Sequence, residues 1–90
     1  MEWINDEKMF FVYVLRSTVN GHFYVGMTEN IANRIARHNR GDNKSTKAHR
    51  PWELFFFESC STRDEARKRE VYLKSGIGKE YIKRKWVEKP

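Results

Sequence analysis

The chain has 90 residues, which fits one domain with a modest core and excludes a catalytic domain joined to a separate recognition domain. No stretch approaches the ~20 apolar residues of a membrane-spanning helix, residues 1–8 lack the apolar region of a signal peptide, and the single cysteine, Cys60, excludes an internal disulfide and a cysteine-built zinc site. The net charge of +6 favours a polyanionic partner, with solvated charge for solubility as the alternative, and we expect a cytoplasmic protein without membrane contact.

Two aromatic and β-branched runs, residues 9–16 and 22–27, predict strands that are half-buried in a sheet. Asn20-Gly21 lies between them. Asn-Gly between two such runs favours a hairpin closed by a two-residue type I′ turn, because both residues tolerate a positive φ. We therefore predict an antiparallel pair of strands with Asn20 and Gly21 at the centre of the turn.

Tyr13 and Tyr24 are candidate site residues because this hairpin brings them together. With the predicted turn, Leu15 lies opposite Gly26, and side chains alternate between the two faces of a strand. Both phenols then fall on the same face, separated diagonally by the bare Gly26. We expect them to act as a pair.

A helix is predicted from about residue 30 to 39, because Ile31 and Ile35 repeat one turn apart and Gly41 is placed to end the helix. Residues 41–50 are expected to form a polar, basic loop. Residues 31–50 carry six Lys or Arg against one acidic residue, and such a basic segment favours nucleic acid. The expected nucleic-acid contacts are Arg37, Arg40, Lys44, Lys47 and Arg50 here, and Lys74 further along the chain.

The segment 52–58 predicts a third strand. Its apolar residues are nearly continuous, which favours a central position between the other two strands, covered on both faces. Pro51 marks the entry to this strand.

The C-terminal third is predicted to be helical. Thr62 and Glu65 have the spacing of a capping box, so a helix begins there and runs to about Ser75. We expect residues 76–78, Gly-Ile-Gly, to break it, and a last, strongly basic helix to follow from 79 to about 87. The sequence therefore predicts an α+β fold, a small three-stranded antiparallel sheet flanked by about three helices. One domain would span 1–90, with a leader at 1–8 and a core at about 9–87.

Glu70 is the most informative position of the predicted helix at 62–75. It shares the core-facing stripe with Ala66, Leu73 and Ile77. A carboxylate on an apolar stripe persists when it is paired or when it binds a cation, because an uncompensated buried charge costs several kcal/mol. An internal salt bridge to an arginine and a metal site are the two alternatives.

Arg34 and His38 lie one turn apart on the first predicted helix, and His38 shares the stripe of the two isoleucines. A histidine on an apolar face is more often a core residue than a catalyst. An arginine beside it favours phosphate chemistry, since guanidinium binds phosphate in bidentate fashion and imidazole moves protons. Two phenols, a guanidinium, an imidazole and a carboxylate match the needs of phosphodiester hydrolysis.

The order and spacing of these residues resemble the GIY-YIG nuclease superfamily, above all its small single-domain bacterial members, over about residues 9–85. Phe11 and Val12 replace the glycine and isoleucine that name the first motif, and Met27 stands where some members carry lysine. The resemblance rests on Tyr13-Val14-Leu15-Arg16-Ser17, Tyr24-Val25-Gly26-Met27-Thr28, Arg34, His38-Asn39, Gly41, Ser45-Thr46-Lys47, Arg50-Pro51-Trp52, Arg69-Glu70 and Leu73-Lys74-Ser75-Gly76.

The resemblance implies a metal-dependent DNA endonuclease domain, related to the nuclease domain of the excision-repair endonuclease. By position, Tyr13 and Tyr24 would order or deprotonate the attacking water, Arg34 would hold the scissile phosphate and His38 would assist. Glu70 would bind one Mg²⁺ or Mn²⁺, weakly without DNA, because magnesium needs few protein ligands.

The expected substrate is DNA, with branched or damaged DNA and a role in repair as candidate specialisations, and RNA stays open. We expect a monomer or a weak homodimer. The alternative function is a nucleic-acid-binding module with little or no cleavage.

Overall fold

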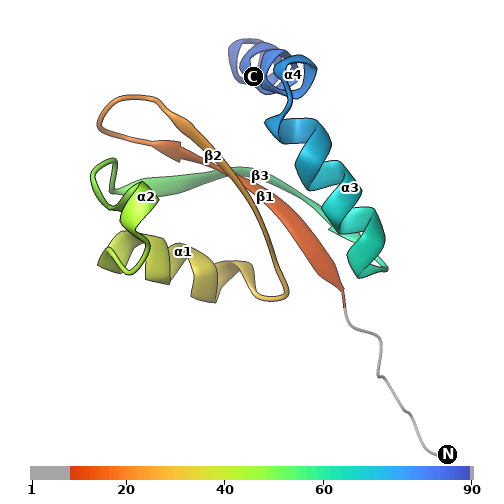
Figure 1. Ribbon diagram of the computed structural model, residues 1–90. Coiled ribbons are helices and arrows are strands. Elements are labelled where there is room, and N and C mark those ends of the chain that lie inside the picture. Colours follow the sequence, from red (N-terminus) through yellow and green to blue (C-terminus); the bar gives the residue numbers. More distant parts are fainter. Residues whose placement is uncertain (1–8, 90) are drawn as a thin grey trace, which may run out of the picture.

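The computed structural model describes residues 9–89 and has an α+β fold, as predicted (Figure 1). The predicted leader at residues 1–8 lies outside the described part. Within that part, three strands form one antiparallel sheet and four helices flank it, one helix more than the sequence suggested. The elements are β1 (Phe10–Ser17), β2 (Phe23–Thr28), α1 (Ile31–Arg40), α2 (Lys44–Lys47), β3 (Trp52–Cys60), α3 (Arg63–Lys74) and α4 (Gly76–Glu88).

The sheet has the order β2-β1-β3, so the prediction that 52–58 would be the central strand is wrong. β1 is central, and its residues Val12–Leu15 are fully buried. β3 lies at an edge, where Leu54 and Phe57 are 40% and 49% exposed. Its pairing with β1 skips Phe55, and this bulge turns both Phe55 and Phe56 toward the same core cluster. β3 is therefore apolar because Phe55 and Phe56 pack against the core from an edge of the sheet.

The β1–β2 hairpin differs from the predicted two-residue turn. Ser17 N–H bonds the carbonyl of His22, so four residues form the loop, and of these only Gly21 has a positive φ, 78°. Asn20 instead uses its side chain, whose Oδ1 accepts from His22 N–H at 3.0 Å. Leu15 consequently pairs with Tyr24. The register moves by two residues from the prediction, which leaves every side chain on its predicted face.

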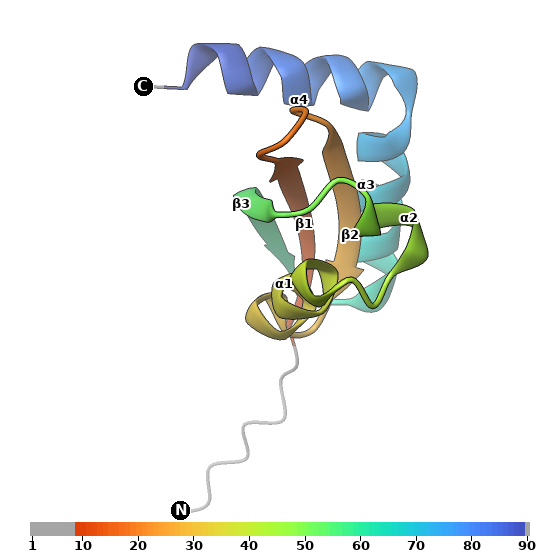
Figure 2. The same cartoon turned by 90° about the vertical axis from the view of Figure 1, so that its left-hand side faces the viewer.

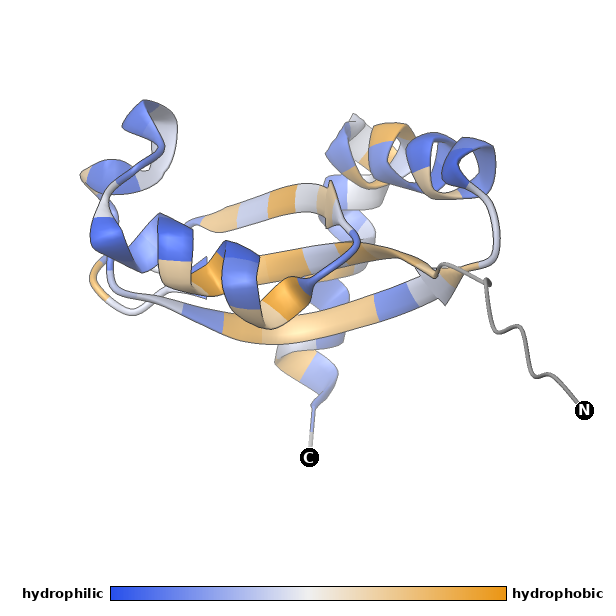
Figure 3. Cartoon of the chain, turned by 90° about the horizontal axis from the view of Figure 1, so that it is seen from below, coloured by the Kyte–Doolittle hydropathy of each residue, from blue (hydrophilic) through white to orange (hydrophobic). Residues whose placement is uncertain are grey.

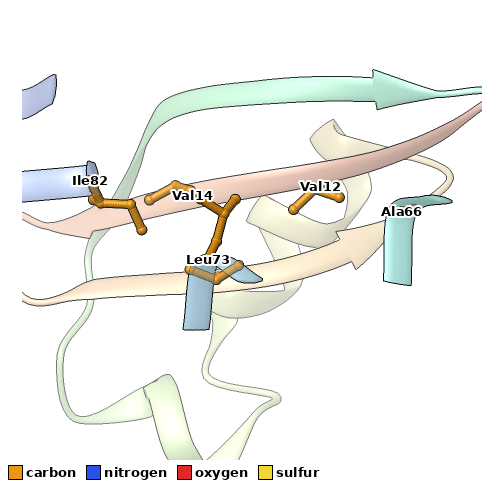
Figure 4. Close-up of a cluster of buried hydrophobic side chains, with 6 residues drawn as sticks. Val12, Val14, Ala66, Leu73 and Ile82 are labelled. Atoms are coloured by element: carbon orange, nitrogen blue, oxygen red, sulfur yellow. The ribbon is translucent and has the colours of Figure 1, made fainter. Parts of the chain in front are cut away.

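Two hydrophobic clusters fill the two faces of the sheet. On one face, α3 and α4 cover alternate residues of β1 and β2, and Figure 4 shows Val14, Leu73 and Ile82 of this cluster close together. The buried members are Val12, Val14, Val25, Ala66, Leu73 and Ile82. On the other face, α1 covers Tyr13, Leu15 and Trp52 with Ile31 and Ile35. Figure 2 shows α4 lying across the end of the sheet away from α1. The phenols thus share the α1 face.

Local signals position α1 as the sequence predicts. Asn30 caps its N-terminus by accepting from Asn33 N–H, and Gly41 ends it with φ 87°. Hydrophobic and hydrophilic residues alternate along this helix, and the strands beside it carry long hydrophobic stretches (Figure 3). The expected loop at 41–50 instead contains α2, which Asn43 caps by accepting from Ser45 N–H.

The C-terminal helices follow the prediction in part. Thr62 caps α3 by accepting from Glu65 N–H at 3.1 Å, while Glu65 accepts from Ser61 N–H. Residues 76–78 do not form a break, because α4 starts at Gly76 with Ser75 as its cap. A Cβ at Gly78 would collide with the backbone of α3, so the glycine allows the two helices to meet closely. Ile77 is 72% exposed and does not extend the stripe of Glu70.

Candidate active site

Tyr13 and His38 form the buried centre of the candidate site. Their residues are 0% and 1% exposed, and the Tyr13 hydroxyl lies 3.0 Å from His38 Nε2. Tyr24 joins them from β2, with its ring centroid 6.3 Å from that of Tyr13 and 4.7 Å from that of His38. Tyr24 is only partly buried, so it is the phenol at the surface of this cluster. The prediction that both phenols share one face is confirmed.

Arg34 reaches the same phenol from α1. Burial raises the pKa of Tyr13 well above its ordinary value of 10.0 and the neighbouring Tyr24 adds to the rise, while the charge of Arg34 and its side-chain hydrogen bond oppose it. The Tyr13 phenol is therefore neutral at neutral pH. It needs a nearby acceptor if it is to give up its proton.

His38 provides that acceptor. Burial lowers the pKa of His38 below its ordinary value of 6.5, and the charges of Arg34 and Arg37 lower it further, so the imidazole is neutral at neutral pH. The next residue holds α1 against β3: Asn39 donates to the Trp52 carbonyl at 3.0 Å and accepts from Trp52 N–H at 2.6 Å. The helix turn that carries His38 is thus tied to the sheet.

Gly26 makes room for the phenol. It pairs directly with Tyr13 across the hairpin. A Cβ at this position would overlap the hydroxyl and ring carbons of Tyr13. The Tyr13 ring therefore occupies the space above Gly26 that any other side chain would fill.

Glu70 lies on the buried stripe of α3, as predicted, between Ala66 and Leu73, and is 8% exposed. Its carboxylate contacts Lys74 Nζ at 3.1 Å and Arg67 Nη1 at 3.5 Å. The expected alternative of a salt bridge to an arginine is therefore present, with Arg67. Both cations belong to the same helix, and their side chains are 52% and 69% exposed, so among residues 9–89 these counter-ions of Glu70 are not buried. Glu70 also raises the pKa of Tyr13, as the smallest of the causes acting on it.

The donor set fits one weakly held, hard cation. Among residues 9–89 no group of three or more His, Cys, Asp or Glu could enclose a metal ion. A single carboxylate suits Mg²⁺ or Mn²⁺, which keep waters and take further oxygens from a phosphate, and it does not suit a structural zinc site. In the structure the ammonium of Lys74 contacts the Glu70 carboxylate, at 3.1 Å.

A small pocket opens beside His38. It has a volume of about 190 Å³ and is lined by Arg34, Arg37, His38, Asp42 and Asn43. Two guanidinium groups at its wall make it suited to a phosphate oxygen. Arg34 also lines a second pocket, of about 280 Å³, on the side of β2 and Asn30. The guanidinium of Arg34 thus lies between the buried phenol and the surface.

The residues predicted to contact nucleic acid lie mainly around α1 and α2. Arg37, Lys44 and Lys47 are exposed there. Arg40 is paired with Asp42 at 2.6 Å, and Arg50 donates to the Arg40 carbonyl at 3.1 Å. Lys74 lies apart from them on α3, in contact with Glu70. Five of the six predicted contacts are therefore grouped around α1 and α2, and the sixth, Lys74, lies beside the Glu70 carboxylate.

Sequence reasoning missed Thr46 as a site residue. It is 1% exposed, and its hydroxyl lies 2.9 Å from His38 Nδ1. The only signal was its place in Ser45-Thr46-Lys47, within a segment expected to be an irregular loop. Burial of a threonine in a basic, polar segment cannot be recognised without the fold.

Comparisons with known proteins agree with this architecture. The family model described as the GIY-YIG catalytic domain matches residues 9–83. A UPF0213 protein of Pediococcus pentosaceus is 41% identical over 75 residues, which cover 82% of this chain and 78% of the relative. A UPF0213 protein of Desulfotalea psychrophila is 39% identical over 71 residues, covering 77% and 64%. One of Staphylococcus epidermidis is 35% identical over 74 residues, covering 81% and 89%.

No solved structure gives a significant match to the chain. In the part of the chain that the structure describes, no helix is both long and apolar enough to cross a membrane. A family match over most of the chain, together with the relatives of Pediococcus pentosaceus and Staphylococcus epidermidis at 41% and 35% identity, shows that this protein belongs to the GIY-YIG nuclease superfamily, among its small bacterial members.

Proposed function

We propose that this protein is a divalent-metal-dependent DNA endonuclease that hydrolyses phosphodiester bonds, with branched or damaged DNA as candidate substrates. The observation that carries the proposal is the environment of the Tyr13 phenol. Its hydroxyl lies 3.0 Å from His38 Nε2, its ring packs near Tyr24, and the charges of Arg34 and Glu70 act on its pKa. These are the groups that water activation and phosphate binding require.

Arg34 would act first, by binding the scissile phosphate from the pocket that it lines beside His38. A guanidinium binds phosphate through two parallel hydrogen bonds, which a single neutral phenol cannot match. When Arg34 turns to the phosphate, the Tyr13 oxygen is opened to water. Substrate binding would thereby uncover the group that accepts the proton.

The proton then follows a short path. Tyr24, the partly exposed phenol, orients the attacking water, whose O–H bond breaks as its oxygen bonds phosphorus. Tyr13 takes that proton and passes its own to His38 Nε2, 3.0 Å away. As the bond from phosphorus to the leaving oxygen breaks, that oxygen keeps the electron pair and takes a proton from solvent water. Arg34 stabilises the charge on the phosphoryl oxygens.

Glu70 would hold the cation, which would supply Lewis-acid polarisation of the phosphate when bound. Lys74 occupies that carboxylate in the free protein. In the complex with DNA, Lys74 would leave Glu70 and contact a neighbouring phosphate. This is the nucleic-acid contact that the sequence predicts for Lys74.

The test is cleavage of supercoiled, branched and flapped DNA in Mg²⁺ or Mn²⁺ by the parent protein and by Glu70→Gln and Tyr13→Phe. Each substitution should lower the cleavage rate by about 10²-fold or more, since each removes a positioned group. Glu80→Gln and Tyr72→Phe, which change exposed residues on α4 and α3, are the matched controls and should cleave at the parent rate.

The alternative, a nucleic-acid-binding module, makes the opposite prediction. The parent would then bind these DNAs without nicking them in either metal, and both substitutions would leave binding unchanged. Such a result would reject the endonuclease proposal. Absence of binding even at low salt would reject both functions.

A further inference from the structure

Thr46 lies at the inner end of a buried chain of hydrogen bonds. The chain runs from the Tyr13 hydroxyl to His38 Nε2 at 3.0 Å, and from His38 Nδ1 to Thr46 Oγ1 at 2.9 Å. Tyr13, His38 and Thr46 are each at most 1% exposed. Water therefore does not compete for these bonds, and each donor in the chain needs an acceptor among the side chains and carbonyls around it.

The direction of each hydrogen bond follows from counting donors. The Thr46 hydroxyl donates to the Asn43 carbonyl, so its oxygen accepts from His38 Nδ1. Tyr13 is fully buried at the other end of the chain. The phenol hydrogen then needs an acceptor, and His38 Nε2 is the group placed to accept it. Neutral imidazole carries one proton, which must therefore lie on Nδ1 and point at Thr46 Oγ1.

Thr46 is arranged to accept that proton. Its own hydroxyl donates to the Asn43 carbonyl, 3.3 Å away, which leaves the oxygen lone pairs free for His38. Its backbone is fixed as well, because Trp52 Nε1 donates to the Thr46 carbonyl at 2.9 Å and Thr46 N–H bonds the Asn43 carbonyl at 3.2 Å. The chain from Tyr13 to Asn43 is then satisfied at every step.

We propose that Thr46 is a positioning residue that fixes His38 in the Nδ1–H tautomer, so that Nε2 always faces Tyr13 as a proton acceptor. The catalytic consequence rests on the proposed endonuclease function, while the tautomer itself does not. A phenol whose hydrogen points at His38 offers only lone pairs on its other side. Tyr13 is thus held ready to accept a proton from water.

Replacing Thr46 with valine keeps the shape and removes the acceptor. A buried Nδ1–H without a partner is costly, so the proton should move to Nε2 and point at Tyr13. Imidazole nitrogen shifts distinguish a protonated, pyrrole-type nitrogen from an unprotonated, pyridine-type one. The experiment is therefore ¹⁵N NMR of the His38 ring at neutral pH, in the parent, Thr46→Val and Thr46→Ser, together with kcat and KM for DNA cleavage.

We expect the parent and Thr46→Ser to show a pyrrole-type Nδ1 and a pyridine-type Nε2. Thr46→Val should show the reverse assignment or a mixture, and its kcat should fall about 10²-fold with KM nearly unchanged, the low end of what a positioned acid–base group contributes. Ser17→Ala is the control, because it removes a buried hydroxyl that bonds the His49 carbonyl and does not contact His38. It should leave the His38 shifts and kcat unchanged.

A parent protein with the proton on Nε2, or a Thr46→Val protein with unchanged His38 shifts, would overturn the inference. If Thr46→Val moves the proton but the parent cleaves no DNA, the positioning role of Thr46 stands and the endonuclease function fails. If Thr46→Val unfolds, Thr46→Ala measured with the same shifts replaces it, with the same expected reversal.

Discussion

Gly26→Ala should destabilise the protein although it adds a single methyl group. The new Cβ would overlap the hydroxyl and ring of Tyr13, which is fully buried. Overpacking of this kind costs about 1–3 kcal/mol. Displacing the phenol also breaks its bond to His38, which adds about 0.5–1.5 kcal/mol. We expect the free energy of unfolding to fall by about 1.5–4.5 kcal/mol.

The assay is urea unfolding followed by circular dichroism, with Gly76→Ala as the matched control. A Cβ at Gly76 meets no atom within 4 Å, and Gly76 lies in α4, where alanine is the better helix former. The control should therefore be unchanged or slightly more stable. A Gly26→Ala protein that unfolds within about 0.5 kcal/mol of the parent would refute the argument, because Tyr13 would then not need the space above Gly26.

Further changes test other parts of the account. Thr62→Ala should lower the free energy of unfolding by about 1 kcal/mol in the same urea assay, because Thr62 caps α3. Since the pKa of His38 in the folded protein lies below its ordinary 6.5, unfolding takes up a proton as the pH falls. Stability should therefore decrease from about pH 7 to about pH 5, and by less in His38→Gln. In paired binding and cleavage assays, Arg34→Gln should lower cleavage far more than DNA affinity and Lys47→Gln should do the reverse; equal losses would contradict both roles.

The sequence predicts those parts of the fold that depend on local patterns. Alternation of apolar residues correctly places Tyr13 and Tyr24 on one face, and this survives a two-residue error in register because the pattern has a period of two. The predicted turn type is wrong, since Asn20 accepts a hydrogen bond through its side chain and does not adopt a positive φ. Sequence does not show which of these two uses of asparagine the surrounding chain favours.

Long-range packing determines the position of β3 in the sheet and the start of α4, which local sequence patterns do not predict. The apolar run of β3 suits a central strand, but it also suits an edge strand that packs Phe55 against Trp86 of α4, at 5.0 Å between ring centroids. Gly78 looks like a helix breaker, yet it lies in the first turn of α4 because α3 approaches too closely for a side chain. In both cases a tertiary contact overrides the local preference.

In the candidate site too, local patterns predict some residues and long-range packing determines the others. Helical periodicity predicts that Glu70 lies on the buried side of α3, because it places this lone carboxylate on the apolar stripe, and the structure agrees. Thr46 was not found, because its importance depends on α2 folding back so that a hydroxyl meets His38. The contact between Lys74 and Glu70 was equally unforeseen, although the two lie one turn apart, because Lys74 was expected to contact nucleic acid instead.

The measurement that tests the central claim most directly is the anomalous scattering of Mn²⁺ in crystals grown with a DNA oligonucleotide. The account predicts an ion bonded to the Glu70 carboxylate, with Lys74 moved away and a phosphate between the ion and Arg34, beside the Tyr13 oxygen. An ion bound elsewhere, with Glu70 still in contact with Lys74 and Arg67 and no phosphate near Tyr13, would contradict it.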